Sequence, residues 1–402
     1  MAVAHRRGHP RVLAGHALSA PDRMQADTFD PHHTTALDHA LDLAEQALWL
    51  TSPNPRVGCV LTDAGGRVLG RGHTQRVGGP HAEVMALRDA QARGHALQGA
   101  TAWVTLEPCA HQGRTGPCCD ALIHAGVARV VALLTDPNPR VAGQGFARLR
   151  SAGVQVEVLE DSAQAERARE QNIGFLHRMR HGLPWTRMKM AASVDGQTAL
   201  ADGQSQWITQ AQARADGHAW RARACAVLTG IGTVLQDNPR LDVRHAPTPR
   251  QPHLVVVDSR LELPLDAALL GTRDAQRQIW VYAAQAGAPG RRAALAERGV
   301  EVIDCAGPGG KVDLRAMLQD LARREINELH IEAGHRLNGS FMREALVDEW
   351  LLYLAPRFMG PGQGLAHLPA LTGIDPWPEH LALRFHEVSP VGPDLRLRLR
   401  RR

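Results

Sequence analysis

The sequence has few of the features that mark membrane and secreted proteins. No apolar run approaches the ~18 residues that a membrane-spanning helix needs, so we expect no membrane partner. The 402 residues include only six cysteines. Four of these stand in apolar stretches, where a free cysteine usually packs as a small hydrophobic side chain: Cys59, Cys119, Cys225 and Cys305. A disulfide framework is therefore not indicated, and a reducing cytoplasm is the compartment we expect.

Lysine is nearly absent, because Lys189 and Lys311 are the only two, and arginine carries most of the positive charge. The arginines are scattered apart from the run at 396–402, so charge supports a nucleic-acid partner only weakly and we predict none. The formal net charge of +5 fits an electropositive site for a phosphorylated small substrate as well. The second half has no G-x-G-x-x-G that opens a helix, which excludes the Rossmann fingerprint there.

A group of metal-binding residue types stands in the first half. His81 is followed two residues later by Glu83, and Glu107-Pro108-Cys109 and then Cys118 come further along the chain. This order is that of the zinc deaminases, H-x-E…P-C-x-x-C. One histidine and two cysteines leave the fourth tetrahedral position for water, which is typical of catalytic zinc. Zinc lowers the pKa of that water towards ~7. We therefore predict His81, Cys109 and Cys118 as zinc ligands and Glu83 as the catalytic proton carrier.

A structural zinc site and a buried cluster without metal are the alternatives. A structural site usually closes with a fourth cysteine or histidine. Cys119 is adjacent to Cys118, and on a helix the two side chains point in different directions, so we do not expect Cys119 to be that ligand. A zinc site without a catalytic role also does not require Glu83. These points favour the catalytic interpretation.

The spacing of the two cysteines departs from the usual pattern. Eight residues lie between Cys109 and Cys118, where the motif usually has two. The insert stands beside the predicted metal, so we expect it to contact substrate. It carries Arg114 and Thr115, which are suited to hold an anion.

Strand and helix signals alternate along the first half. Helical spacing covers 38–50, and a second helix is expected to start near His81 and a third at Pro117. Apolar runs predict strands at 57–61, 68–70, 101–106 and 127–134. A polar helix is predicted over 162–180, and the His-Gly-Leu-Pro sequence that follows it marks a domain boundary. This alternation favours a three-layer α/β domain over residues 34–181.

Residues 1–33 are rich in His, Arg, Pro and Ala and lack a helical or strand period. We expect a disordered tail. A transit peptide and a start codon assigned too early, with Met24 nearer the real start, are alternatives.

The second half, residues 182–402, also alternates. A helix is predicted over 211–224. Strands are predicted at 185–192, 226–228, 253–258, 278–282, 300–303, 329–331 and 349–355. The pattern indicates a second α/β domain, but it leaves the chemistry of that domain open.

The run from Thr105 to Cys118 resembles the deaminase half of the bifunctional deaminase/reductase of riboflavin biosynthesis. Motifs of the second half resemble the reductase half of that family: Lys189 with Ala192-Ser193-Val194-Asp195-Gly196, Ser205-x-Trp207-Ile208-Thr209, Gly232-Thr233, Asn238-Pro239-x-Leu241 and Glu332-Ala333-Gly334. The resemblance covers about residues 35–390. It implies a cytidine-deaminase-like three-layer α/β/α domain followed by a dihydrofolate-reductase-like α/β domain that uses NADPH.

The resemblance also implies ligand contacts. Those with NADPH are Ala191, Trp207, Thr233, Asp237, Ser259 and the loop Gly334, His335, Arg336, Leu337, Asn338, Gly339 and Ser340. Those with the deaminase substrate are Asn54, His73, Arg114, Thr115, Asp136 and Asn138. Those with the reductase substrate are Ser205, Arg221, Leu241, Arg244 and Glu332.

Without the resemblance, these residues have simpler interpretations. Asn54, Asp136 and Asn138 are typical turn residues beside proline. Trp207 and Leu241 would pack in a core, and Arg221 and Arg244 would be solvated surface charges. The proton donor of the reductase half stays open among Lys189, Asp195 and Asp237.

The function that the resemblance implies has two steps. The first half would deaminate 2,5-diamino-6-(5-phosphoribosylamino)pyrimidin-4(3H)-one, and the second half would reduce the ribosyl group of the product to ribityl with NADPH. We also expect a homo-oligomer. One rival is a tRNA- or nucleoside-type zinc deaminase with an accessory domain, which shares the zinc residues but needs no second domain of this size. The other rival is a zinc-stabilised binding protein.

Overall fold

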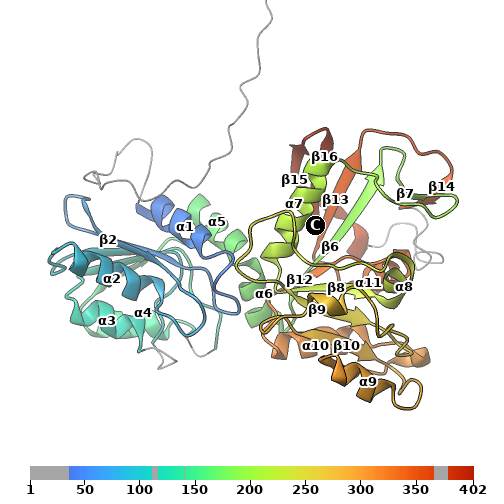
Figure 1. Cartoon of the computed structure of the whole chain (residues 1–402). Helices are drawn as coiled ribbons and strands as arrows, with labels where there is room; N and C mark the ends of the chain where they lie inside the picture. The colour runs from blue at the N-terminus through green and yellow to red at the C-terminus, as the bar shows by residue number, and fades with distance from the viewer. Residues whose placement is uncertain (1–35, 111–115, 140, 366–378) are drawn as a thin grey trace, which may run out of the picture.

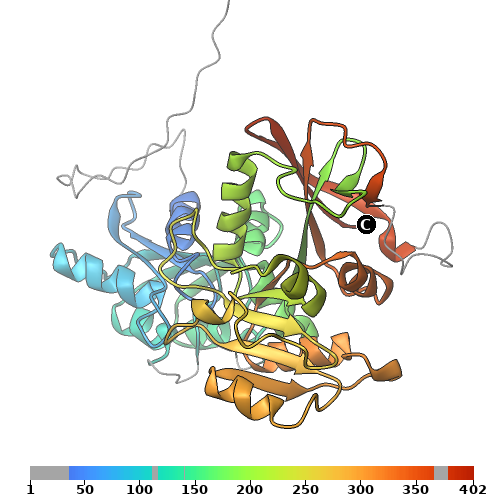
Figure 2. The same ribbon diagram turned by 45° about the vertical axis from the view of Figure 1, so that its right-hand side comes forward.

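The computed structural model describes residues 36–110, 116–139, 141–365 and 379–402. The predicted tail at 1–33, Arg114 and Thr115 lie outside the described residues. The described strands form a five-stranded sheet, a nine-stranded sheet and a two-stranded sheet. The first sheet and its helices lie beside the larger second unit in both views (Figures 1 and 2).

The five-stranded sheet has the order β2-β1-β3-β4-β5. Strand β1 is antiparallel to β2 and β3, whereas β3, β4 and β5 are parallel. The strands are β1 (Gly58–Thr62), β2 (Val68–His73), β3 (Thr101–Val104), β4 (Arg129–Ala132) and β5 (Gln155–Val158). They fall at or near the predicted positions, and β5 was not predicted.

Helices cover both faces of this sheet, which confirms the three-layer prediction (Figure 1). One face carries α1 (Ala36–Gln46) and α5 (Ala163–Gln171), and the other carries α2 (Ala82–Ala92), α3 (Cys118–His124) and α4 (Gln144–Ser151). The backbones of strand β2 and helix α2 pack closely together. A Cβ on Gly72 would lie only 2.5 Å from the Ala86 nitrogen. Glycine therefore lets α2, which begins directly after His81, lie flat against the sheet.

The single helix predicted over 162–180 is wrong. The chain forms two helices there, α5 and α6 (Ile173–His181), which meet at Asn172. The Asn172 side chain accepts from the Arg56 nitrogen at 2.7 Å and donates to the Arg56 oxygen at 2.9 Å. This contact with a residue 116 positions away holds Asn172 outside helical geometry, and no local sequence signal announces it.

The nine-stranded sheet has the order β11-β10-β9-β8-β12-β6-β13-β16-β15. The strands from β11 to β13 in this order are parallel, and β16 and β15 are antiparallel. They are β6 (Trp185–Ser193), β8 (Ala226–Gly230), β9 (His253–Val257), β10 (Ile279–Ala283), β11 (Val300–Asp304), β12 (Glu328–Ile331), β13 (Glu349–Ala355), β15 (Leu383–Val391) and β16 (Asp394–Arg401).

Helices and short elements complete the second unit. The helices are α7 (Ala211–Arg223), α8 (Ile231–Asp237), α9 (Arg291–Glu297), α10 (Leu314–Arg323) and α11 (His335–Arg343). The 3-10 turns are η1 (Leu270–Thr272), η2 (Pro308–Gly310) and η4 (Glu379–Leu381). Strands β7 (Gln197–Leu200) and β14 (Gly362–Gly364) form the small sheet. The predicted α/β class is confirmed, although α8 and the β15–β16 hairpin were not predicted.

The arginine run at 396–402 belongs to strand β16 and is not a free basic stripe. Leu395, Leu397 and Leu399 alternate with the arginines, which is the period of a strand. Arg396, Arg398 and Arg400 each form ion pairs with buried or partly buried carboxylates. Three of the five arginines in this run are therefore neutralised within the fold.

Separate apolar clusters lie in the two units. The first extends from Leu37 to Leu176, and two large clusters of the second unit contain buried residues from Met188 to Trp350. Among the described residues no helix is long and apolar enough to cross a membrane.

Candidate active sites

Three predicted zinc ligands meet at the ends of three elements. His81 directly precedes α2, Cys109 follows β3, and Cys118 is the first residue of α3. The His81 Nδ1 atom lies 3.3 Å from the Cys118 Sγ and 3.6 Å from the Cys109 Sγ. No other His, Cys, Asp or Glu within the described ranges joins this group, whose ligand atoms lie within 4.8 Å of one another. Three donors and a free position are what a catalytic zinc requires.

The charge state of the cysteines suits a divalent metal. Hydrogen bonding from the Cys118 thiol lowers the pKa of Cys109 to about 4, while the same hydrogen bond and burial raise the pKa of Cys118. The Cys118 backbone N–H also donates to the Cys109 sulfur at 3.4 Å. Cys109 is therefore the more readily ionised of the two thiols, and a bound cation would displace the proton of Cys118 to solvent when its sulfur coordinates. These residues fit zinc. Cys119 points elsewhere, as expected, because its thiol donates to the Pro108 oxygen at 3.1 Å.

Glu83 is buried in the first turn of α2, two residues after His81. Burial raises the pKa of its carboxyl to about 6, and the negative charge of Cys109 acts in the same direction. A carboxyl whose pKa lies near neutrality can both accept and return a proton. Glu83 therefore lies beside the metal ligands, where a proton carrier is needed.

Glu107, which directly precedes Pro108 and Cys109, has a structural role that its place in the motif does not predict. Its buried carboxylate accepts hydrogen bonds from four backbone N–H groups of the 136–146 loop, which includes the first turn of α4: Asp136 at 3.1 Å, Gly143 at 3.0 Å, Gly145 at 2.9 Å and Phe146 at 3.3 Å. The 136–146 loop is thereby held against Pro108. A Cβ on Gly145 would lie 2.0 Å from the Pro108 oxygen, so glycine is required for this approach.

Asn54, His73, Asp136 and Asn138, the predicted deaminase substrate residues that the structure describes, lie in loops and at a strand end of the first unit. Asp136 is buried, and burial raises the pKa of its carboxyl to about 7. Its side chain accepts from the Asn138 nitrogen at 2.8 Å. His73 ends β2 and pairs in register with Gly58 of β1, and burial lowers the pKa of its imidazole. Their roles, and that of Asn54, stay predictions, as do those of Arg114 and Thr115.

Thr233, Ser259 and Gly334, three of the predicted NADPH residues, lie at the carboxyl ends of neighbouring parallel strands. Strands β8 and β12 are adjacent; α8 begins directly after β8, and a short turn after β12 leads into α11. The hydroxyl of Thr233, in the first turn of α8, accepts from the Gly334 nitrogen at 3.1 Å, which joins α8 to the turn before α11. Ser259 follows β9, the next strand along. This edge is where open α/β sheets bind nucleotides, and Gly334 at the start of α11 leaves backbone N–H groups for phosphate.

The other predicted NADPH residues differ in exposure and in position. His335 and Arg336 are exposed, whereas Asn338 is buried and donates to the Ala333 oxygen at 2.9 Å. Trp207 is 62% exposed, so the simpler view of it as a core residue is wrong. Asp237, at the end of α8, is also exposed. Ala191 lies on β6, in register with Tyr353 of β13.

Three of the five predicted reductase substrate residues, Arg221, Glu332 and Arg244, are linked by polar contacts. Arg221 of α7 donates to both oxygens of Glu332, at 2.6 and 2.8 Å. It also donates to the Asp242 oxygen at 2.7 Å, next to Leu241. Arg244 forms an ion pair with the Asp242 carboxylate. Ser205 has no hydrogen bond to this group within the part of the chain that the structure describes.

The Arg221–Glu332 pair is nearly buried, with side chains 12% and 14% exposed. Burial acts to raise the pKa of Glu332, but the charge of Arg221 outweighs it and holds that pKa well below the usual value. Glu332 is therefore ionised near neutrality. The resemblance implies Arg221 and Glu332 as separate substrate contacts, and no sequence signal predicts that they pair with each other.

The three candidate proton donors differ in their surroundings. Asp195 accepts from the Ser193 hydroxyl and from the backbone nitrogens of Met359 and Gly360, the last at 2.9 Å. The Ser193 hydrogen bond is the main cause of its lowered pKa, so it stays ionised. Lys189 of β6 has a pKa lowered by burial, and it interacts electrostatically with Glu332 and Arg221. Lys189 is thus the candidate that stands with the substrate residues.

A histidine, two cysteines and a buried glutamate on a five-stranded α/β domain define a zinc-dependent deaminase joined to a second α/β domain. Residues 31–134 match the family described as "Cytidine and deoxycytidylate deaminase zinc-binding region", and residues 184–397 match "RibD C-terminal domain". The chain belongs to the RibD family of riboflavin biosynthesis proteins.

Similar proteins agree over nearly the whole chain. The Escherichia coli K12 protein "Riboflavin biosynthesis protein RibD" is 42% identical over 369 residues, which cover 90% of this chain and 97% of that protein. The protein of the same description from Aquifex aeolicus is 39% identical over 89% of this chain and 95% of its own length.

Solved structures show the same arrangement. "Acinetobacter baumannii RibD, form 1" superposes with a TM-score of 0.79 at 39% identity, covering 91% of this chain and 97% of that chain. The Thermotoga maritima "diaminohydroxyphosphoribosylaminopyrimidine deaminase/ 5-amino-6-(5-phosphoribosylamino)uracil reductase" has a TM-score of 0.78 at 28% identity, covering 91% and 98%. The chain is accordingly a bifunctional enzyme with a deaminase and a reductase domain.

Glu107→Gln tests the role assigned to Glu107. The amide replaces one acceptor oxygen by a donor, so at least one buried N–H group of the 136–146 loop loses its partner. We expect the free energy of unfolding to fall by about 1–3 kcal/mol and zinc affinity to weaken about 10–100-fold. Chelator competition and thermal unfolding measure the two effects. Glu157→Gln, at an exposed ion pair with Arg129, is the control and should change neither. Unchanged zinc affinity in Glu107→Gln would contradict the role.

Proposed function

We propose that the first domain hydrolytically deaminates 2,5-diamino-6-(5-phosphoribosylamino)pyrimidin-4(3H)-one and that the second reduces the ribosyl group of 5-amino-6-(5-phosphoribosylamino)uracil to ribityl. The observation that carries the first reaction is the convergence of His81, Cys109 and Cys118 beside the buried Glu83. The name of the similar Thermotoga maritima enzyme supports both substrates.

In the deaminase site each residue has one task. His81, Cys109 and Cys118 would hold zinc, which supplies a water acidic enough to act as hydroxide near pH 7. The Glu83 carboxylate accepts one proton of the attacking water and passes it to the ring nitrogen. It then accepts the second proton of the same water oxygen and passes it to the departing amine, which leaves as ammonia. Asn54, His73, Asp136 and Asn138 orient the pyrimidine, and Arg114 and Thr115 of the insert hold the phosphate.

Glu83→Gln keeps the size of the side chain and removes the proton carrier. Deamination should fall by about 10²–10⁴-fold or more, the loss typical of an acid–base group. One zinc per chain should remain by elemental analysis, and reduction of pre-deaminated substrate should be unchanged. Ammonia release from the pyrimidine ribotide and from RNA separates this function from that of a tRNA-editing enzyme. A wild-type deamination rate in the variant would show that Glu83 carries no essential proton.

In the reductase site NADPH would lie along the carboxyl ends of β8, β9 and β12. Thr233, Ser259 and the 334–340 segment would hold it, with Ala191, Trp207 and Asp237 at its borders. When bound, the cofactor supplies hydride to C1 of the sugar. Glu332 and Arg221 orient the polar edge of the substrate, Ser205 and Leu241 border it, and Arg244 binds the phosphate. Lys189 donates the proton.

Arg244→Gln tests phosphate recognition against a matched neighbour. Arg240 and Arg244 both form ion pairs with Asp242, at partly exposed positions. Arg244→Gln should raise the reductase KM for the phosphorylated substrate by about tenfold or more, because a charge-assisted hydrogen bond is lost. Arg240→Gln should leave KM within a factor of about two, as surface ion pairs contribute little. Equal KM values for phosphorylated and dephosphorylated substrate in the wild type would remove the basis for this role.

We further propose a cytoplasmic location and a homo-oligomer. All six cysteines lie in the described part of the chain and none is paired, which fits a reducing compartment. The edge strand β15 exposes Phe385 and Val388, at 67% and 55%. Exposed apolar side chains on a long edge strand favour pairing with a second copy.

The oligomer is tested on the full chain by light scattering. We expect a mass that is a multiple of that of one chain, reduced to a single chain in Phe385→Asp. Phe358→Asp is the control, because Phe358 is 83% exposed but lies outside β15. A monomeric wild type would refute the proposal, and dissociation by Phe358→Asp alone would place the interface elsewhere.

A further inference from the structure

The segment that carries Asn54 is held from outside the deaminase domain. It precedes β1, and the second domain contacts it at two points. The Asn327 side chain donates to the Pro53 oxygen at 2.9 Å. The Ser52 hydroxyl lies 2.9 Å from the sulfur of the buried Cys225, within hydrogen-bonding distance. These contacts hold the two residues directly before Asn54, which is proposed to orient the deaminase substrate.

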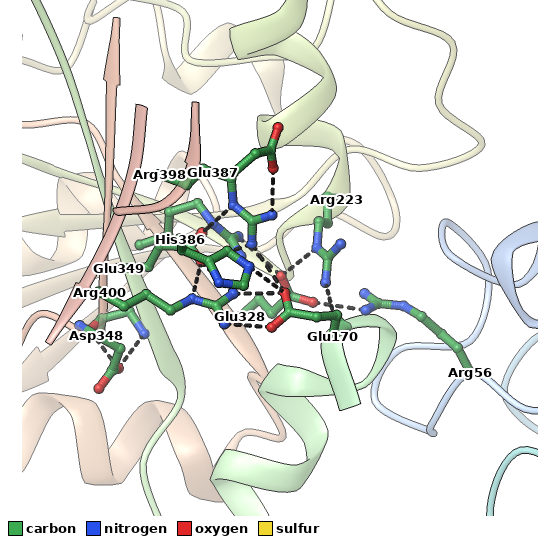
Figure 3. A network of polar contacts seen from close by, with 12 residues as sticks. Arg56, Glu170, Arg223, Glu328, Asp348, Glu349, His386, Glu387, Arg398 and Arg400 are labelled. Carbon is green, nitrogen blue, oxygen red and sulfur yellow. Dashed lines mark hydrogen bonds and ion pairs between the residues drawn. The ribbon is translucent and has the colours of Figure 1, made fainter. Parts of the chain in front are cut away.

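Arg56 anchors the other side of Asn54. Its guanidinium donates to the Glu328 carboxylate at 2.9 Å and also to the Gln171 oxygen. Its backbone nitrogen and oxygen are both bonded to the Asn172 side chain. Figure 3 shows Arg56 reaching from the ribbon of the first domain to Glu328 of the second. The segment is thus bonded on both sides of Asn54 to residues 327 and 328.

Glu328 is a fixed point for this contact. Its fully buried carboxylate also pairs with Arg187 at 3.1 Å and Arg223 at 2.7 Å. Burial acts to raise its pKa, but the charges of the three arginines outweigh it and hold the pKa well below the usual value. A buried carboxylate neutralised in this way cannot move without leaving charge unpaired. Arg56 therefore binds to a rigid partner.

These contacts fix the backbone around Asn54, and its side chain remains available to bind substrate. Its backbone nitrogen donates to the Thr51 oxygen at 2.7 Å. Its side chain has no hydrogen bond to any other residue in the described ranges. We propose that the reductase domain positions Asn54 for deamination, with Arg56, Asn327 and Glu328 as positioning residues. The proposal rests on the function proposed above, in which Asn54 contacts the pyrimidine substrate.

The position of Asn327 and Glu328 explains how a strand of the reductase domain can position Asn54 of the deaminase domain. Both stand at the start of β12, and Glu332, a reductase substrate residue, directly follows the same strand. One end of β12 thus borders the deaminase loop and the other borders the reductase site. A displacement of the loop by about 1 Å lengthens a hydrogen bond from Asn54 to the substrate beyond its normal range, which weakens substrate binding.

The test uses two variants of the full chain and one control. Asn327→Asp keeps the acceptor oxygen that Arg178 contacts at 2.6 Å but loses the donor to Pro53. Arg56→Met removes the ion pair and keeps the backbone bonds to Asn172. The control is Glu387→Gln, which breaks ion pairs with Arg396 and Arg398 inside the same network but away from residues 51–57.

Both variants should raise the deaminase KM for the pyrimidine ribotide by about tenfold, the effect of one lost orienting hydrogen bond. Their kcat should stay within about threefold, zinc should remain at one per chain, and the reductase kinetics with pre-deaminated substrate should be unchanged. The control should leave the deaminase KM unchanged. If Arg56→Met does not fold, Asn327→Asp decides alone.

Other results overturn the proposal. An unchanged deaminase KM in the folded variants shows that the domain contact does not position the loop. Loss of zinc, or an equal fall of both activities, shows that the contact serves stability only. A wild-type enzyme that releases no ammonia from the ribotide would refute the proposed function instead.

Discussion

The two domains depend on the neutralisation of buried carboxylates between them. Glu328 and Glu349 are both fully buried, and each pairs with three arginines, among which Arg187 contacts both. Removing one partner of such a pair leaves an uncompensated charge, which destabilises a protein by about 3–5 kcal/mol. The network therefore determines how the domains meet, and with it the place of each loop that touches the boundary (Figure 3).

The zinc site was predictable because its chemistry is local. His81, Glu83, Cys109 and Cys118 stand in a fixed order, and each lies at or near the end of a helix or strand with a clear signal. The α/β class of both domains followed from periodicity in the same way. The reductase half was recognisable only by its resemblance to a family, since each of its motifs is short and its sheet lacks a glycine fingerprint.

The ion-pair network was not predictable, because its partners are distant in sequence. Arg56 and Glu328 are 272 positions apart, and nothing near either residue indicates the other. The same reason explains the break at Asn172, which Arg56 imposes on an otherwise helical sequence. The role of Glu107 was hidden for a different reason, since its four partners are backbone groups that carry no sequence signal.

Strand β16 has a consequence for how the molecule is made. Glu170 of α5 pairs with Arg398 and Arg400 of that strand, which are synthesised 228 and 230 residues later. Until they emerge from the ribosome, Glu170 is solvated, and the deaminase domain exists without the surface that it finally presents to its neighbour. The first domain can close around its own apolar cluster early. The junction between the domains is completed only when β16 adds to the sheet.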